Sequence, residues 1–141
     1  MTELGAEFAA HLLVEGNWNH IVKLESAMEL LSPRLNLKIS AMRCRDMADE
    51  EDQSLPYAID VFATDKSNNI HELCAFLTAR NIKIVDMTTS RYTAAYSGIA
   101  VFLAHIIVTV PVSQRIVSLR DEFLDFCDQM NIDAILEPVK R

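Results

Sequence analysis

The sequence predicts an α+β protein on the ferredoxin-like βαββαβ plan, with an antiparallel sheet that carries its helices on one face. Three observations support this fold class: a repeated block of residues, an alternation of strand-like and helix-like segments, and a composition that is 50% hydrophobic and 23% charged over 141 residues. This composition is typical of globular proteins, and a chain of this length can bury roughly two-thirds of its unfolded surface. We therefore expect a packed core.

The repeated block links the start of the chain to its last third. Residues 8–14 read FAAHLLV and residues 102–108 read FLAHIIV, an offset of 94, since 102 minus 8 is 94. Further along, residues 21–24 (IVKL) match residues 116–119 (IVSL) at an offset of 95. Two matches in the same order at nearly one offset indicate that one folding unit occurs twice.

The first copy is expected to begin with a strand at the apolar run 7–15. Asn17 or Asn19 can cap the helix that follows, and Pro33 is expected to end it. The apolar residues of this helix recur at helical spacing, at positions 21, 24, 28, 31 and 35.

Residues 37–44 predict the closing strand of the first copy, so residues 1–46 are a partial domain that contains only strand, helix and strand. The opening strand, first helix and nearly all of the second strand have no counterpart there. Such a half-unit has three outcomes: its unpaired strands pair with each other, another chain completes it, or the reading frame is truncated at its start. We expect its exposed apolar surface to drive self-association.

The second copy, residues 57–141, follows an acidic segment at 47–56 that reads as a linker and contains every element of the plan. A turn is expected near Ser97-Gly98. The predicted elements are strands at 57–64, 82–93, 99–110 and 133–139, a helix at 68–80, and a helix capped by Ser113 with inward residues up to Met130.

Residues 65–73 (DKSNNIHEL), followed by Asn81-Ile82, resemble an ACT domain. Longer stretches resemble the glycine cleavage system transcriptional repressor family, and together they cover nearly the whole chain. These stretches are 13–19 (LVEGNWN), 75–77 (AFL), 85–89 (VDMTT), 119–123 (LRDEF) and 133–139 (DAILEPV).

This resemblance implies two tandem ACT domains in the cytoplasm, sheets that pair side by side or face to face, and repression of the glycine cleavage operon. Repression would act through contact with a separate transcriptional activator, with glycine as the signal. The family normally begins about half a domain earlier, which agrees with the repeat and indicates an N-terminal truncation of this chain.

The charge balance and the cysteines agree with a cytoplasmic protein that contacts another protein rather than DNA. Lys and Arg total 13 against 20 Asp and Glu, a net charge of -7, which disfavours direct binding of nucleic acid. The sequence contains no run of 18 apolar residues, so we expect no membrane span, and the start of the chain does not resemble a signal peptide. The three separated cysteines are expected to be reduced thiols in the cytoplasm.

The segment Asp65 to Ile70 is the candidate ligand site, because a strand is expected to end and a helix to begin there. Free backbone N–H groups at a helix start can hold a carboxylate, and Asp65 could meet an amino group. Ser67, Asn68 and Asn69 either contact the ligand or simply cap the helix. ACT domains usually carry Gly where this chain has Asn68, and Asn tolerates the positive φ of such a turn.

No catalytic, cofactor or metal-binding motif was found, so we expect neither an enzyme nor a cofactor. His11 and His105 occupy equivalent positions and are interpreted as structural residues on a sheet face, and Cys74 and Cys127 as small buried side chains. Two alternatives to the repressor remain: a small amino-acid-binding module without a transcriptional role, and a non-functional fragment.

Overall fold

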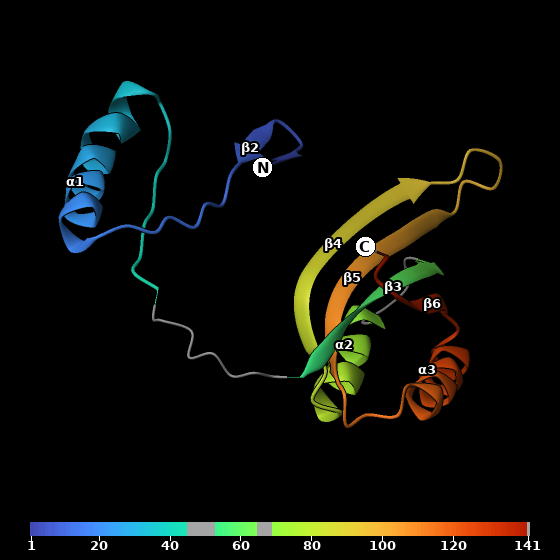
Figure 1. Cartoon of the computed structure of the whole chain (residues 1–141). Helices are drawn as coiled ribbons and strands as arrows, with labels where there is room; N and C mark the ends of the chain where they lie inside the picture. The colour runs from blue at the N-terminus through green and yellow to red at the C-terminus, as the bar shows by residue number, and fades with distance from the viewer. Residues whose placement is uncertain (45–52, 65–68, 141) are drawn as a thin grey trace. The chain divides into compact units, whose positions relative to one another are not determined.

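The computed structural model describes residues 1–44, 53–64 and 69–140, and the chain divides into two compact units, Met1–Ala48 and Asp49–Arg141 (Figure 1). The predicted α+β plan is confirmed in the second unit, which has the order βαββαβ. Its elements are β3 (Ser54–Thr64), α2 (Asn69–Ala79), β4 (Lys83–Thr93), β5 (Ala100–Pro111), α3 (Ile116–Met130) and β6 (Asp133–Pro138).

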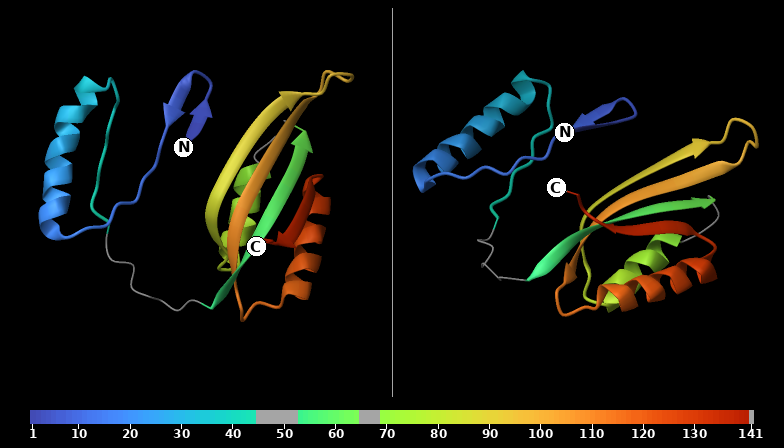
Figure 2. Two further views of the ribbon diagram at one scale, coloured as in Figure 1. Left: turned by 45° about the horizontal axis from the view of Figure 1, so that its top comes forward. Right: turned by 45° about the vertical axis from the view of Figure 1, so that its right-hand side comes forward.

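The sheet of the second unit has the strand order β4-β5-β3-β6, and all its pairings are antiparallel. Both α2 and α3 cover the same face, and no helix of the described residues of this unit covers the other face (Figure 2). Alternate residues of the central strands β3 and β5 point to the helices and are buried. The most deeply buried side chains of this core are Ile59, Val61, Leu73, Leu77, Ile106, Val108, Leu119 and Phe123.

Arg80, just beyond the end of α2, joins the two helices. Its guanidinium carbon lies 3.7 Å from the centre of the Phe76 ring, and Nη1 donates to the Phe76 carbonyl at 3.1 Å. Its Nε lies 2.8 Å from Oε2 of Glu122 on α3. The Phe76 ring also stacks on Phe126 of α3, with ring centres 4.7 Å apart. The Arg80 side chain therefore links α2 to α3 beside the stacked rings of Phe76 and Phe126.

The described helices all end in the same way. Asn36, Asn81 and Asn131 follow them with φ of 53°, 57° and 53°, the left-handed conformation that Asn tolerates. The next residue donates its N–H to a carbonyl five residues back: Leu37 to Ser32, Ile82 to Leu77, and Ile132 to Cys127. This is the Schellman arrangement, which satisfies carbonyls that the helix leaves unpaired.

The first unit contains β1 (Thr2–Leu4), β2 (Glu7–Ala9) and α1 (Trp18–Arg34). β1 and β2 form a hairpin, with Gly5 at φ 64° in its turn. The Asn17 side chain caps α1, because its Oδ1 accepts the His20 N–H at 2.9 Å, as predicted. No residue in the described part of this unit is buried.

Several predicted boundaries were wrong, chiefly in the first unit. The strand predicted at 7–15 is formed only over Glu7–Ala9, and residues 37–44 form no strand. The reason is that a strand needs a hydrogen-bonded neighbour, and in the second unit β3 lies between the equivalent strands. Pro33 lies inside the last turn of α1 rather than ending the helix, because a proline this close to the end costs few helix bonds.

Smaller differences occur in the second unit. β3 begins at Ser54, so its first three residues belong to the segment predicted as linker. The helix expected to be capped by Ser113 begins at Ile116, with Arg115 at the cap position and no side-chain cap bond. The predicted turn at Ser97-Gly98 is confirmed, since Gly98 has φ 66° and its N–H donates to the Ala94 carbonyl.

Candidate functional site

The predicted ligand segment is only partly described. Asp65, Ser67 and Asn68 lie outside the described residues, whereas Asn69 and Ile70 form the start of α2. A helix therefore begins where the sequence predicted it, within one residue. Binding of an amino acid at this turn stays a prediction.

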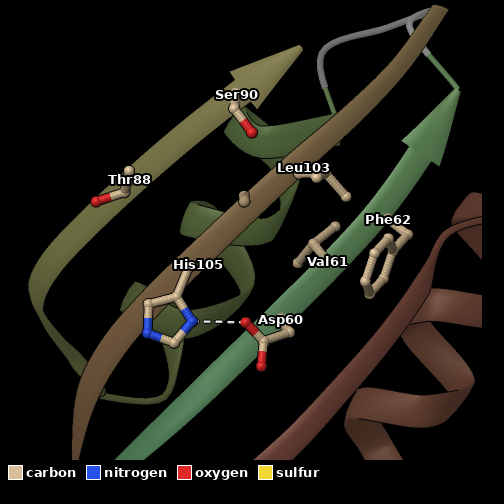
Figure 3. A pocket seen from close by; sticks show the side chains of 8 residues that line it. Asp60, Val61, Phe62, Thr88, Ser90, Leu103 and His105 are labelled. Carbon is tan, nitrogen blue, oxygen red and sulfur yellow. Dashed lines mark hydrogen bonds and ion pairs between the residues drawn. The ribbon is translucent and has the colours of Figure 1, made fainter. Parts of the chain in front are cut away.

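The helix-free face of the sheet carries a polar pair that sequence reasoning missed. His105 on β5 lies opposite Asp60 on β3, and its Nδ1 is 2.5 Å from the Asp60 Oδ1 (Figure 3). Because a carboxylate can only accept, Nδ1 carries the hydrogen of this bond. The two side chains are 51% and 48% exposed, so the pair lies at the surface.

A shallow hollow of about 210 Å³ surrounds this pair (Figure 3). Thr88 and Ser90 of β4 border it on one side and Phe62 of β3 on the other. The register explains the arrangement: Thr88, His105 and Asp60 form one row across the sheet. Ser90, Leu103 and Phe62 form the next row.

We call this surface the open face; it carries apolar side chains beside the Asp60–His105 pair and further carboxylates on both edge strands, Asp86 on β4 and Asp133 and Glu137 on β6. Phe62 and Ile135 are about half exposed there. The open-face residues identified by the register include Ala58, Asp60, Phe62, Asp86, Thr88, Ser90, Leu103, His105, Ile107, Asp133, Ile135 and Glu137, with Lys83 at one end. Four carboxylates thus share this face with one lysine and one histidine.

The two histidines that the sequence predicted to be equivalent differ in their surroundings, and so do the two cysteines that were predicted to be buried. His105 lies on a sheet face as predicted, but His11 lies outside any strand and is exposed, because its segment has no neighbour. Cys127 is buried as predicted, whereas Cys74, for which the same was predicted, is only half-buried. Burial, followed by the nearby Asp128 and Asp133, raises the pKa of the Cys127 thiol to about 11. Such a thiol stays protonated at neutral pH and is a poor nucleophile.

Within the part of the chain that the structure describes, no group of three or more His, Cys, Asp or Glu side chains could hold a metal ion. None of the described helices is long and apolar enough to cross a membrane.

Neither a protein-family profile nor a curated protein matches this sequence, but solved structures match its fold. A proposed glycine cleavage system transcriptional repressor superposes with a TM-score of 0.67 and 21% identity, over 89% of this chain and 70% of that one. An uncharacterised protein from Galdieria sulphuraria gives 0.64 and 19%, over 82% and 66%. The chain thus spans about two-thirds of each of these proteins.

An ACT domain protein from Streptococcus pneumoniae gives a TM-score of 0.50 and 19% identity, over 60% of this chain and 90% of that one. The same fold also occurs in an enzyme, because a formyltetrahydrofolate deformylase from Pseudomonas putida gives 0.50 and 8%, over 60% and 29%. At these identities the matches establish an ACT-like fold. They do not establish an activity, which has to be argued from the surface residues of this chain.

Proposed function

We propose that the protein is a non-enzymatic regulator of the ACT type that acts in the cytoplasm by contact with another protein. The observation that carries this proposal is the similarity to a proposed glycine cleavage repressor over 89% of this chain. The finer role we propose is repression of the glycine cleavage operon through its transcriptional activator, with glycine as the signal and no cofactor.

The open face is the surface that fits such a partner. Exposed Phe62 and Ile135, together with Leu103, offer apolar surface beside the Asp60–His105 pair, of the kind found in protein interfaces. Asp60, Asp86, Asp133 and Glu137 make the same face acidic. A transcriptional activator has a basic surface where it meets DNA, and an acidic face can cover that surface while repelling nucleic acid.

Co-purification of the full chain with the activator of the glycine cleavage genes, with and without glycine, tests this proposal. The variant Asp133→Asn/Glu137→Gln should weaken the association and reduce its dependence on salt. The matched control Asp121→Asn/Asp125→Asn removes the same charge from α3, on the opposite side of the sheet, and should associate normally. Failure of the unmodified chain to associate under either condition would remove the proposal.

A small amino-acid-binding module without a transcriptional role is the second candidate. It is favoured by the start of α2 at Asn69, within the predicted ligand segment Asp65–Ile70, because the first N–H groups of a helix have no acceptor within the helix itself. Calorimetry with glycine and serine distinguishes the two candidates. Binding heat that disappears in Asp65→Ala, together with no association between the unmodified chain and the activator, would support an amino-acid-binding module.

A further inference from the structure

We propose that the hollow beside Asp60 and His105 anchors an arginine side chain of the partner protein, whose guanidinium group lies over the Phe62 ring and pairs with the Asp60 carboxylate. This assignment rests on the proposed contact with another protein, since the arginine belongs to that partner. The whole site lies in the second unit, on β3, β4 and β5.

The polar atoms of the hollow can accept hydrogen bonds, so a ligand there has to donate them. His105 uses the hydrogen on Nδ1 for its bond to Asp60, which leaves Nε2 of the neutral ring as an acceptor. The second carboxylate oxygen of Asp60 points away from that ring, and no described side chain pairs with it (Figure 3). Thr88 and Ser90 add hydroxyl oxygens from β4. This set of acceptors fits a group that carries several N–H donors.

The charge around the hollow favours a cation. Asp60 lines the hollow itself, and Asp86 and Asp133 lie in the neighbouring rows of the open face. The lysine of this face, Lys83, lies opposite a residue of β5 four positions beyond His105, which is about 13 Å along the strand. No lysine or arginine of the described residues lines the hollow. A cationic group of the partner is therefore attracted to Asp60 without competition from a neighbouring lysine or arginine.

The Phe62 ring favours a guanidinium over an ammonium group. Phe62 is 47% exposed and follows Asp60 by two positions on β3, so both side chains stand on one face with Cα atoms about 7 Å apart. A planar guanidinium stacks on an aromatic ring while its N–H groups reach a carboxylate, whereas an ammonium is a strongly hydrated point charge. An arginine over Phe62 is therefore within reach of Asp60.

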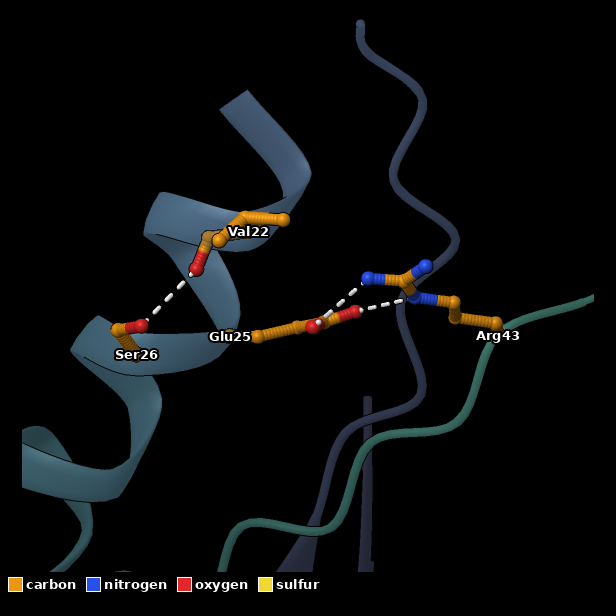
Figure 4. A network of polar contacts seen from close by, with 4 residues as sticks. All are labelled: Val22, Glu25, Ser26 and Arg43. Carbon is orange, nitrogen blue, oxygen red and sulfur yellow. Dashed lines mark hydrogen bonds and ion pairs between the residues drawn. The ribbon is translucent and has the colours of Figure 1, made fainter. Parts of the chain in front are cut away.

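Two arginines of this chain make the same kinds of contact. The guanidinium carbon of Arg80 lies 3.7 Å from the centre of the Phe76 ring, and its Nε lies 2.8 Å from the Glu122 carboxylate. Arg43 donates from Nε and Nη2 to both carboxylate oxygens of Glu25, at 2.8 and 3.1 Å (Figure 4). The hollow presents the ring and the carboxylate together, so an arginine of the partner can combine both contacts there.

The size of the hollow fits one side chain of a larger partner better than a free small molecule. Its volume of about 210 Å³ is below the ~300–1,000 Å³ of most small-molecule pockets. Asp60 and His105 are each about half exposed, whereas such pockets bury most of their ligand. Ile135, half exposed and in the same row as Asp60, is placed to contact the surface of the partner around the arginine.

Titration of the full ¹⁵N-labelled chain with the blocked tripeptide acetyl-Gly-Arg-Gly-amide tests the site by two-dimensional NMR. We expect a dissociation constant of about 1–10 mM, with shift changes concentrated on the amides of β3, β4 and β5 around the hollow. The same peptide with citrulline, the uncharged isostere of arginine, should not bind, and the lysine peptide should bind at least ~3-fold more weakly. No shift changes, or equal binding of the arginine peptide and either of the others, would overturn the proposal.

Free arginine distinguishes a docking site from a small-molecule site. Its carboxylate is repelled by the acidic open face, so free arginine should bind more weakly than the blocked peptide. Tighter binding of free arginine would refute the assignment to a protein partner.

Single substitutions locate the contact. Asp60→Asn keeps the size of the side chain and should weaken binding of the arginine peptide at least ~5-fold, and Phe62→Leu about 2–5-fold. The matched comparison Asp86→Asn removes the same charge from the same face outside the hollow and should weaken binding less than ~2-fold at physiological salt. The spectra also show whether each variant is folded. Equal losses in Asp60→Asn and Asp86→Asn would indicate general attraction to the acidic face and overturn the site.

The outcome for this site is separate from the outcome for the regulatory role. Binding of the arginine peptide at the hollow supports the site whether or not the activator of the glycine cleavage genes associates with the chain. Association with that activator that is unchanged in Asp60→Asn, together with no binding of the peptide, would overturn the site and leave the proposed regulator.

Discussion

Replacing Arg80 by alanine should destabilise the second unit by about 1.5–4 kcal/mol, although Arg80 lies at its surface. The side chain has three contacts to lose. Its position 3.7 Å from the Phe76 ring is worth about 0.5–2 kcal/mol, and its bond to the Phe76 carbonyl about 1 kcal/mol. The pair with Glu122 adds little, because that carboxylate is half exposed and water screens the attraction to roughly 0–1 kcal/mol.

Urea unfolding followed by far-UV circular dichroism measures this loss. Tryptophan fluorescence is unsuitable, because the single tryptophan, Trp18, lies in the first unit and is exposed. Glu122→Ala should cost no more than about 1 kcal/mol, and Arg120→Ala, an exposed arginine on the same helix as Glu122, less than about 0.5 kcal/mol.

A double-mutant cycle then identifies the contact that matters. The coupling between Arg80 and Glu122 should be less than half of the total loss in Arg80→Ala, because most of that loss belongs to the contacts with Phe76. A loss below about 0.5 kcal/mol in Arg80→Ala would refute the reasoning, and so would a coupling that equals the whole loss.

Three further predictions concern single positions. Cys127 should react with a thiol reagent far more slowly than exposed Cys44 at pH 8. The free energy of unfolding should fall between about pH 9 and 11, because the thiol ionises at a lower pH in the unfolded chain than in the native protein. Urea titrations of Cys127→Val should show a smaller fall over this pH range. Asn131→Ala should cost about 1 kcal/mol, whereas Asn131→Gly should be nearly neutral, as thermal unfolding will show, because alanine is strained at φ 53°. His105→Ala should lower the free energy of unfolding, measured by urea titration, by less than about 1 kcal/mol, since its pair with Asp60 is exposed; a larger loss would show that the pair holds the sheet together.

The second unit was largely predictable from its sequence because each local signal there agrees with its neighbours. The predicted strands at 57–64 and 99–110 lie close to the observed β3 and β5, and the two predicted helices correspond to α2 and α3. The pair of Asp60 and His105 was not predictable, since it depends on the register between strands 45 residues apart. A shift of one residue would have placed the two side chains on opposite faces of the sheet.

A helix end is formed by local hydrogen bonds, whereas a strand needs a neighbouring strand. Residues 31–44 show this difference, because the helix end forms there and the strand does not. Asn36 adopts φ 53° and the Leu37 N–H donates to the Ser32 carbonyl in a unit whose described residues include none that is buried, just as Asn131 and Ile132 form the same turn in the packed second unit. Helix termination is therefore decided within about six residues, because its hydrogen bonds are local. The strand that should follow has no such local bonds, and β6 forms only because β3 lies beside it.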